Sequence, residues 1–496
     1  MPEDALVNAS AVQWPHPDSA YFTVREMQIK LHRWAGEDSS RRFGDLFNLV
    51  YDPAFLMHAW ERVSTNAGAR TPGVDKATVA MIETWVGVEE FLGQIRDLLK
   101  AGEFRPVEVR QVMIPKKSGK LRKLGIPTVA DRVVQASLKA VLEPIFEADF
   151  QPCSYGFRPN RRAQDAIAEI QFYGTRRYHW VLEADIKACF DEISHTALME
   201  RLRARIKDKR ICALVKAFLK SGVMTAVGDR EETLTGTPQG GILSPLLANI
   251  ALSALDEHFI RQWQQEMGTD GQRAKRRRSG QGNWKLIRFA DDFVIMVSGQ
   301  RHHAEALREE VTAVLAPLGL RLAPDKTRVV HLDEGFDFLS FTICRQRKRG
   351  TQKHYVYTKP SRKAIQAVKD KVKAKTYRST RHMAPDELIT SLNRLLAGWA
   401  NYFRYAVSKA VFSAIDSLAW GRIMRWLRRK YKRGRNRIGM PELRRRFCDK
   451  GWRFAWNGVA FTGASSVTVT RYRYRGTKIS TPWTPRPAAA AATTGG

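Results

Sequence analysis

The sequence predicts an α+β fold with more than one domain. Its 496 residues correspond to about three domains at roughly 150 residues each. Short runs rich in β-branched residues, at 107–126, 180–186 and 286–297, lie between stretches whose apolar residues recur at helical spacing. After residue 357 the pattern is helical only, which indicates a separate C-terminal helical domain.

Composition restricts the function classes. The chain has 83 Lys and Arg against 50 Asp and Glu, a formal net charge of +33, and such a surface favours a polyanionic partner. A hydrophobic fraction of 44% excludes a disordered basic tail. The five cysteines form no C-x-x-C pair, so we expect reduced thiols and no zinc ribbon. Without a signal peptide or an 18-residue apolar run, we expect a cytoplasmic protein with no membrane partner.

The first half of the chain predicts helices around one hairpin. Residues 1–40 show no clear period and are interpreted as a partly ordered leader. Pro115-Lys-Lys-Ser-Gly-Lys is a turn signal, so 107–126 is interpreted as a hairpin with a cationic tip. The apolar spacing predicts helices at 46–63, 82–99, 131–146 and 160–172, a short strand at 180–186, and a basic helix pair over 195–219.

The second half begins with a helix over 244–259, for which Ser244 is the expected N-cap and Pro245 the first helical residue. Residues 264–283, with five cations between Arg273 and Arg278, are interpreted as an exposed insertion loop. Residues 286–297 predict two short strands around an acidic turn. In the C-terminal helical region, 421–450 holds 13 Lys and Arg against two acids.

Three carboxylates stand where predicted strands end. Asp185 closes one strand, and Asp291-Asp292 form the turn between two apolar strands. Adjacent carboxylates in an apolar hairpin repel each other, and a divalent cation would remove that cost. Two Mg²⁺ ions held by carboxylates can stabilise both oxygens of a phosphoryl transfer. Taken alone, an Asp-Asp pair is more typical of a solvated turn, but the apolar flanks and the second strand-end Asp favour the metal site.

Ordered motifs extend this pattern from about Leu46 to Tyr405. They are Thr71-Pro-Gly-Val-Asp, Lys120-Leu-Arg-Lys-Leu-Gly-Ile-Pro-Thr with Asp131-Arg-Val-Val-Gln, Ser154-Tyr-Gly-Phe-Arg-Pro, Ala184-Asp-Ile-Lys-Ala-Cys-Phe-Asp-Glu-Ile, Gly236-Thr-Pro-Gln-Gly-Gly-Ile-Leu-Ser-Pro-Leu-Leu-Ala-Asn, Phe289-Ala-Asp-Asp and Leu392-Asn-Arg-Leu-Leu-Ala-Gly-Trp-Ala-Asn-Tyr-Phe. In these motifs the sequence resembles the group II intron-encoded reverse transcriptases, which combine reverse transcription with assistance to RNA splicing.

The resemblance implies a right-hand polymerase with fingers, an antiparallel-sheet palm and a helical thumb. The expected parts are a leader (1–40), an N-terminal extension with fingers (41–175), a palm (176–354) that includes part of the fingers (232–260) and the basic loop (264–283), a thumb or maturase domain (355–455) and a tail (456–496). Two departures are Phe289, where many relatives have Tyr, and Lys76, where Gly is usual. After Tyr405 there is no signature of an HNH nuclease, so we do not expect second-strand cleavage to be encoded.

The resemblance also implies roles for single residues. Asp185, Asp291 and Asp292 would be catalytic, and the metal ligands would be Asp185, Ile186, Asp291 and Asp292. The expected cofactor is two Mg²⁺ ions, with Mn²⁺ as a substitute. The nucleotide-binding residues would be Lys117, Arg122, Phe190, Gln239 and Lys326. Phe190 would crowd the sugar 2′-carbon and so favour deoxynucleotides, although a core aromatic explains the same residue.

RNA binding is assigned to cations and aromatic rings, which supply phosphate contacts and stacking surfaces. The assigned residues are Arg158, Arg273, Arg276, Lys371, Lys375, Trp399, Tyr402, Arg425, Arg428 and Arg429, and Tyr405 and Trp426 offer further rings. A plain amphipathic bundle with a charged outer face explains each of these residues individually.

The implied function is an RNA-directed DNA polymerase that copies intron RNA into cDNA and, as a maturase, supports splicing and retrohoming. Its expected partners are structured intron RNA, an RNA template with a DNA primer, dNTPs and a DNA target, with the ribonucleoprotein in the bacterial cytosol or nucleoid. Two alternatives stay open: a host-recruited reverse transcriptase, for example in phage defence, and a non-catalytic RNA-binding splicing cofactor.

Overall fold

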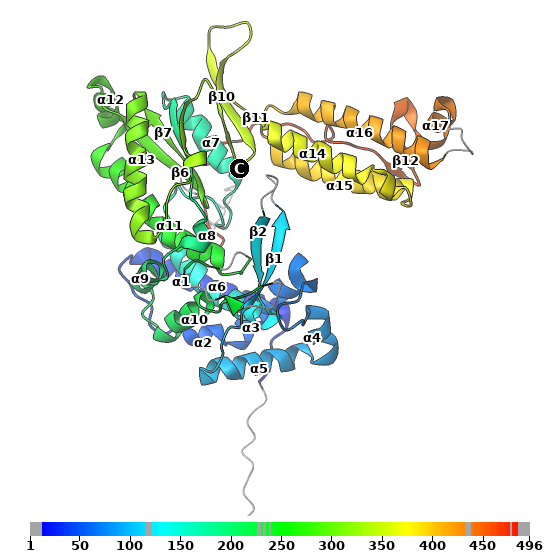
Figure 1. Cartoon of the computed structure of the whole chain (residues 1–496). Coiled ribbons are helices and arrows are strands. Elements are labelled where there is room, and N and C mark those ends of the chain that lie inside the picture. The colour runs from blue at the N-terminus through cyan, green and yellow to red at the C-terminus, as the bar shows by residue number, and fades with distance from the viewer. Residues whose placement is uncertain are drawn as a thin grey trace, which may run out of the picture.

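Helices surround a four-stranded antiparallel sheet in the computed structural model, which describes residues 12–115, 121–225, 230–231, 235–237, 240–431, 438–476 and 479–484 (Figure 1). The mixed helix and sheet content confirms the α+β prediction. No helix in these ranges is both long and apolar enough to cross a bilayer.

Six α-helices form the described N-terminal part, and the first three pack on the last. They are α1 (Pro17–Glu37), α2 (Phe47–Val50), α3 (Pro53–Ser64), α4 (Val79–Trp85), α5 (Val88–Ala101) and the long α6 (Val129–Asp149). Helix α6 is buried on almost every side because α1, α2 and α3 pack around it. The interpretation of residues 1–40 as a partly ordered leader is wrong for 17–37. Ala20, Val24, Leu31 and Ala35 form one buried face of α1, and their modest size lets α1 approach α6 closely.

The predicted hairpin is confirmed as strands β1 (Val109–Pro115) and β2 (Leu121–Ile126), paired from Arg110–Ile126 to Pro115–Leu121. Two short strands, β4 (Val223–Met224) and β5 (Arg230–Glu231), extend it to a sheet of order β2-β1-β4-β5. The residues of the cationic tip, 116–120, lie outside the described part of the chain.

The main sheet has the order β6-β7-β3-β8 and is antiparallel throughout. Its strands are β3 (Trp180–Asp185), β6 (Asn283–Phe289), β7 (Asp292–Ser298) and β8 (Arg328–His331). Alternate residues of β3 enter two cores: Leu182 and Ala184 join one with α11 and α13, and Val181 joins the other with α7. The sheet is therefore covered on both faces, which explains the continuous apolar runs.

Helices cover this sheet and connect its strands. They are α7 (Ala163–Gly174), α8 (Cys189–Glu192), α9 (His195–Arg205), α10 (Lys209–Leu219), α11 (Ser244–Arg261), α12 (Asp270–Arg278) and α13 (Arg301–Leu315). Helix α11 begins at Ser244, so Leu243 and not Ser244 occupies the cap position, while Pro245 lies in the first turn as expected.

The exposed loop expected over 264–283 is wrong in part, because α12 forms within it. Thr269 accepts from the backbone N–H of Gln272, and the Gln272 side chain accepts from the backbone N–H of Thr269. This capping box and an ion pair between Arg273 and Asp270 (2.7 Å) stabilise a helix made almost wholly of polar residues.

A second sheet leads to the C-terminal helices. Strands β9 (Phe336–Phe338), β10 (Phe341–Arg347) and β11 (His354–Pro360) form an antiparallel sheet of order β11-β10-β9. Helices α14 (Arg362–Lys375), α15 (Pro385–Phe403), α16 (Lys409–Lys430) and α17 (Met440–Phe447) then project as an arm, with β12 (Ala455–Trp456) and β13 (Val459–Ala460) beside α15 (Figure 1).

The C-terminal segment runs back from the arm to the N-terminal helices. Asp416 on α16 accepts from the backbone N–H groups of Ala464 and Ser465. Further along, Arg475 pairs with the buried Asp165 of α7 (2.6 Å). The indole of Trp483 then donates to Gln28 on α1 (3.0 Å). This segment, 462–484 in its described residues, therefore ties the arm, the sheet and α1 together.

Candidate active site

Three carboxylates meet at one end of the main sheet. Asp185 is the last residue of β3 and lies directly opposite Asp292, the first residue of β7. Phe289 pairs with Asp292, so Ala290 and Asp291 form a two-residue turn, and Ala290 has a φ of 59°. The antiparallel register thus brings together residues that are about a hundred positions apart in the sequence. The juxtaposition predicted for Asp185, Asp291 and Asp292 is present.

Burial and neighbouring negative charge raise the pKa of two of these carboxylates, Asp291 and Asp292. Burial, followed by the charges of Asp291 and Asp185, raises the pKa of Asp292 to about 7. Burial and the charge of Asp185 likewise raise the pKa of Asp291. The site therefore carries more negative charge than the protein alone stabilises, and it favours a cation.

Lys326 supplies one such cation. It ends a short 3₁₀ turn, Pro324–Lys326, and its ammonium group forms an ion pair with Asp185. The turn is fixed to the end of β3 because the Ala323 backbone N–H donates to the Asp185 carbonyl (2.8 Å). The hydrogen bond to Asp185 raises the pKa of Lys326, so the group is charged at neutral pH.

Arg122 on β2 acts on the same site through its charge. Its side chain is exposed, and its charge lowers the pKa of Asp291 against the effect of burial. Two other predicted nucleotide-binding residues, Lys117 and Gln239, lie outside the described residues. Gly240, which follows Gln239 in the sequence, packs on β2 so closely that a Cβ there would lie 2.5 Å from the Gly125 carbonyl oxygen.

Phe190 lies on α8, close behind Asp185 in the chain. Its half-buried ring meets the exposed ring of Phe157 edge-on, with 6.2 Å between centroids. Its carbonyl accepts from the Thr237 backbone N–H (2.5 Å), so the Gly236-Thr237 segment rests on α8. The sequence analysis assigned no role to Phe157, although the Ser154-Tyr-Gly-Phe-Arg-Pro motif contains it.

A buried arginine holds the acidic turn in place. Arg288 pairs with Asp256 of α11 (2.5 Å), and both side chains are fully buried. Its guanidinium also donates to the Ala290 carbonyl (2.8 Å) and to Ser154 Oγ (2.8 Å). Gly156 lies against this turn, since a Cβ there would come within 2.3 Å of the Ala290 nitrogen. Neither Arg288 nor Asp256 was predicted from the sequence, where the only signal was an arginine in an otherwise apolar run, Leu286-Ile-Arg-Phe.

The carboxylates fit divalent cations by their chemistry. Within the described ranges no three His, Cys, Asp or Glu side chains form a ready-made metal cage. Mg²⁺ does not need one, because it typically takes one or two carboxylates and completes its shell with phosphate oxygens and water. Ile186 has an apolar, buried side chain and could offer only its backbone carbonyl. Families of reverse transcriptases use divalent metal ions, and this donor set agrees with that use.

Three of the predicted RNA contacts are corrected. Arg158 is buried and donates to Glu147 (2.7 Å) and to backbone carbonyls, so it stabilises the fold and cannot reach RNA. The Trp399 ring is half-buried between Phe403 and Phe412 and belongs to the core of the arm. Trp426 is buried as well.

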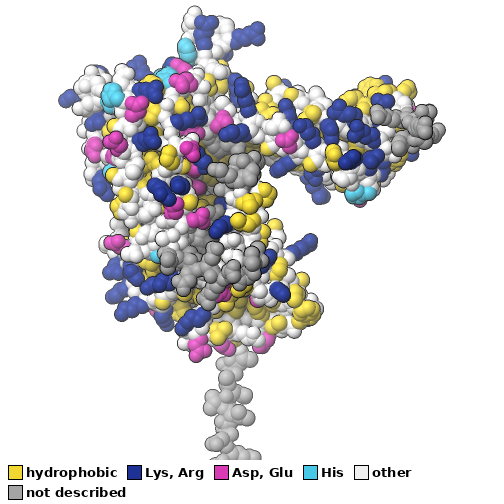
Figure 2. All heavy atoms as spheres, viewed as in Figure 1, with side chains coloured by type: hydrophobic (Ala, Val, Ile, Leu, Met, Phe, Trp, Pro, Cys, Tyr) yellow, Lys and Arg dark blue, Asp and Glu magenta, His cyan; other side chains and the backbone are white. Residues whose placement is uncertain are grey.

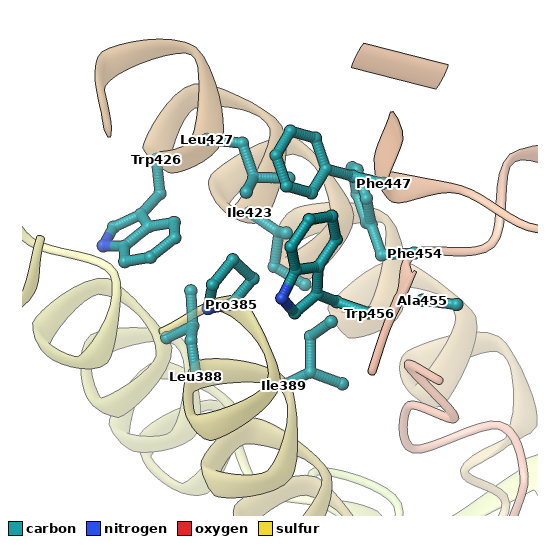
Figure 3. A pocket seen from close by; sticks show the side chains of 10 residues that line it. All are labelled: Pro385, Leu388, Ile389, Ile423, Trp426, Leu427, Phe447, Phe454, Ala455 and Trp456. Carbon is teal, nitrogen blue, oxygen red and sulfur yellow. The ribbon is translucent and has the colours of Figure 1, made fainter. Parts of the chain in front are cut away.

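The surroundings of Trp426 confirm its structural role. Figure 3 shows it with Pro385, Leu388, Ile423, Phe447 and Trp456 among ten apolar residues that close around one another. These side chains leave no room for a water molecule. This cluster is the packed core between α15, α16 and α17, and it is not a ligand site.

The remaining predicted RNA contacts divide into two groups. Arg273, Arg276 and Tyr402 are engaged locally: Arg273 with Asp270, Arg276 with the Gly282 carbonyl, and the Tyr402 hydroxyl with the Leu339 carbonyl (2.9 Å). Five others lie on the surface of α14 and α16 as exposed or half-exposed cations: Lys371, Lys375, Arg425, Arg428 and Arg429. Figure 2 shows Lys and Arg gathered over this arm.

Comparisons with known proteins agree with this geometry. A family model described as reverse transcriptase (RNA-dependent DNA polymerase) matches residues 114–343, and a model described as group II intron, maturase-specific domain, matches residues 365–446. Protein YkfC of Escherichia coli is 38% identical over 359 residues, which are 69% of this chain and 93% of YkfC. The group II intron-encoded protein LtrA of Lactococcus lactis is 32% identical over 364 residues, 64% of this chain and 59% of LtrA. An uncharacterized 91 kDa protein in the cob intron of Schizosaccharomyces pombe is 31% identical over 60% of this chain and 42% of that protein.

The first model ends within β10 and the second covers α14 to α17, so the boundary between the two matches coincides with the start of the helical arm. The chain belongs to the group II intron-encoded reverse transcriptases that carry a maturase domain, and the sheet with the three aspartates lies within its polymerase part.

Proposed function

We propose that this chain extends a DNA primer on intron RNA at the end of the main sheet and that its arm binds the same RNA as a maturase. One observation carries the polymerase half: Asp185 stands opposite Asp292, next to Asp291, with Lys326 and Arg122 in electrostatic reach. On this proposal the palm spans 176–354 and the thumb 355–455.

The metal ligands would be the carboxylates of Asp185, Asp291 and Asp292 and the backbone carbonyl of Ile186. When bound, two Mg²⁺ ions, or Mn²⁺ in their place, would stabilise charge on the attacking and leaving oxygens. The chain's own part is to hold these oxygen donors rigidly. The Arg288 contact with the Ala290 carbonyl does this for the acidic turn, since positional precision is what the reaction requires of its site.

The nucleotide would meet cations from two sides. Arg122 and Lys117 on the hairpin, and Lys326 beside Asp185, would neutralise the triphosphate. Gln239 and Gly240 would line the base and sugar. Phe190, braced by Phe157, would fill the space that a ribose 2′-hydroxyl needs, so that deoxynucleotides are preferred.

The arm would bind structured RNA through the cations of α14 and α16. Lys371, Lys375, Arg425, Arg428 and Arg429 face solvent at least in part, and the acid-poor stretch 421–450 continues this surface. Arg273 and Arg276 on α12 would add phosphate contacts at the far side of the palm. We expect a ribonucleoprotein in the bacterial cytosol that acts on a DNA target in retrohoming.

A double variant tests the polymerase activity and the maturase activity separately. Asp291→Ala with Asp292→Ala should abolish cDNA synthesis on an RNA template and leave binding and splicing of the intron RNA within about threefold of the parent. Loss of cDNA synthesis alone supports both halves of the proposal. If splicing is lost although the variant melts at the parent's temperature, the carboxylates also take part in splicing and the proposed separation of the two activities is wrong. Retained cDNA synthesis would also reject it.

A further inference from the structure

Strands β10 and β11 form a ribbon that projects from the body of the molecule (Figure 1). Strand β9 pairs with β10 only from Phe341 to Ile343, so beyond Cys344 the ribbon is two-stranded. Its end is closed by a turn in which the Lys348 backbone N–H donates to the Lys353 carbonyl (2.8 Å). Every side chain from 346 to 355 is exposed. No packing therefore supports the outer half of the ribbon.

The ribbon lies far from the carboxylates. At its root Arg345 pairs with Asp333 (2.6 Å) and contacts the ring of His179 (3.1 Å). His179 precedes β3, whereas Asp185 ends it. Six strand residues separate the two ends by roughly 20 Å, and the tip extends further in the other direction. A nucleotide at the aspartates cannot touch it.

The outer ribbon carries cations without acidic partners. Arg347, Lys348, Arg349 and Lys353 occur within seven positions, and the sequence has no Asp or Glu from 338 to 369. In the described part of the chain none of these four forms an ion pair. Figure 2 shows Lys and Arg side chains on this projection. Like charges on a bare two-stranded ribbon raise its free energy, and such a ribbon is only marginally stable in water. A polyanion would remove this cost.

The shape of the ribbon favours one kind of polyanion, a DNA duplex, over an RNA duplex. The major groove of B-form DNA is about 12 Å wide and admits a two-stranded β-ribbon, whereas the major groove of an A-form RNA helix is too narrow for it. Tyr355, 44% exposed with the Lys348 ammonium 5.9 Å from its ring centroid, adds an apolar surface that can meet base edges.

From this geometry we propose that the β10–β11 ribbon, through Arg347, Lys348, Arg349, Lys353 and Tyr355, is a docking surface for double-stranded DNA, separate from the polymerase site and from the cations of α14 and α16. The ribbon would enter the major groove while its cations contact phosphates on both sides.

The test compares two full-length variants that each lose four charges. The ribbon variant is R347Q/K348Q/R349Q/K353Q. The matched control is K207Q/K209Q/K216Q/K220Q, which removes four exposed lysines on and beside α10. Binding of a labelled 30-bp DNA duplex and of a 30-bp RNA duplex is followed by fluorescence anisotropy from 50 to 300 mM KCl. Thermal melting and extension of a primer on a short RNA template at saturating concentration establish that each variant is folded.

The ribbon variant should bind the DNA duplex at least about tenfold more weakly at 100 mM salt, with a log–log salt slope shallower by about 3, since each phosphate contact contributes about 0.9. The control should lose less than about threefold, and binding of the RNA duplex should change equally little in both variants. Equal loss of DNA binding in both variants would mean that only net charge matters and would overturn the proposal. An equal or greater loss on the RNA duplex would overturn the assignment to B-form DNA. Primer extension should persist in the ribbon variant. If the parent protein itself fails to extend a primer, the proposed polymerase function is wrong. The DNA-binding measurements still decide whether the ribbon is a docking surface for DNA.

Discussion

Lys326 occupies the carboxylate of Asp185, which on the proposed function would also bind a metal ion. Its ammonium pairs with Asp185, and the charges of Asp292 and Asp291 further favour its protonated form. An arriving triphosphate offers this cation a stronger anionic partner. On the proposed function, binding of the triphosphate would therefore draw Lys326 away from Asp185 and leave a carboxylate oxygen free to bind a cation.

Lys326→Ala should raise the KM for dNTPs by about tenfold, because it removes one charge-assisted contact to the triphosphate, and should lower kcat less. Steady-state primer extension at varied dNTP concentration measures both parameters. Lys326→Arg, which keeps the charge, should restore most of the KM. An unchanged KM in Lys326→Ala would show that the lysine serves only to neutralise Asp185.

Phe190→Ala should raise ribonucleotide incorporation relative to deoxynucleotide incorporation by at least about tenfold, because it removes the ring that excludes the 2′-hydroxyl. Single-nucleotide extension with matched dNTP and rNTP pairs gives the ratio. Phe190→Tyr keeps the ring and should leave the ratio near that of the parent. If Phe190→Ala leaves sugar discrimination unchanged, the ring belongs to the core alone.

At the scale of elements, the strands around the carboxylates could be predicted from the sequence. The buried hydrogen bonds that hold these strands in place could not. Strand β3 is an apolar run that ends in Asp185, and β6 and β7 are apolar runs on either side of the acidic turn, a pattern visible in a short window of sequence. The Arg288 network is invisible in such a window, because Asp256 and Ser154 lie 32 and 134 positions away. Arg158 was assigned to RNA for the same reason: its buried partner Glu147 decides its role, and nothing in the local pattern shows that pairing.

Helices α1 and α12 show the other limits of local patterns. Helix α1 buries a narrow stripe of modest-sized side chains while Tyr21 and Phe22 stay exposed, so its apolar period is masked. Helix α12 has no apolar face and depends on its capping box. In contrast, Lys76 has a φ of 59°, as the usual glycine at that position suggests.

The start of helix α6 makes stability depend on pH. Asp131 is buried in the first turn and accepts from the Thr128 hydroxyl (2.8 Å), and burial raises its pKa to about 6. Between pH 4 and 6 the folded state keeps a proton that the unfolded state, with a pKa near 4, has released. The free energy of unfolding therefore falls as pH rises through this window.

Asp131→Asn keeps an oxygen that can accept the hydrogen bond from the Thr128 hydroxyl, and it removes the carboxyl group that binds the proton. Relative to the variant, the parent should lose about 1–3 kcal/mol of stability between pH 4 and 6. Urea unfolding at pH 4, 5, 6 and 7 measures the difference for each pH. A difference that is constant across this range would mean that Asp131 is ionised throughout and that burial does not govern its pKa.

At the scale of the whole molecule, the chain has a net charge of +33. Its C-terminal segment also connects parts of the fold that are distant in the sequence. The segment 462–484 joins the arm to α7 and α1 through Asp416, Asp165 and Gln28. RNA held by α14 and α16 would therefore stay in a fixed relation to the polymerase site. From the sequence, 456–496 was interpreted only as a tail, since its contacts with α7 and α1 join residues more than 300 positions apart along the chain.

Replacing Lys371, Lys375, Arg425 and Arg429 with Gln should weaken binding of structured intron RNA and make its log–log salt slope shallower by about 3, because each lost phosphate contact removes roughly 0.7–0.9. Filter binding at several salt concentrations measures the slope. Primer extension on a short unstructured template should persist. An unchanged slope would place the maturase surface elsewhere.

We propose above all that the three aspartates at the end of the main sheet would hold the metal ions that position the reacting phosphate. The most direct measurement is an experimental structure of the chain with an RNA template, a dideoxy-terminated DNA primer, an incoming dNTP and Mg²⁺. We expect the α-phosphate beside Asp185 and Asp291, with Lys326 moved from Asp185 to the triphosphate. A nucleotide bound at any other place, with the Lys326–Asp185 pair intact, would contradict it.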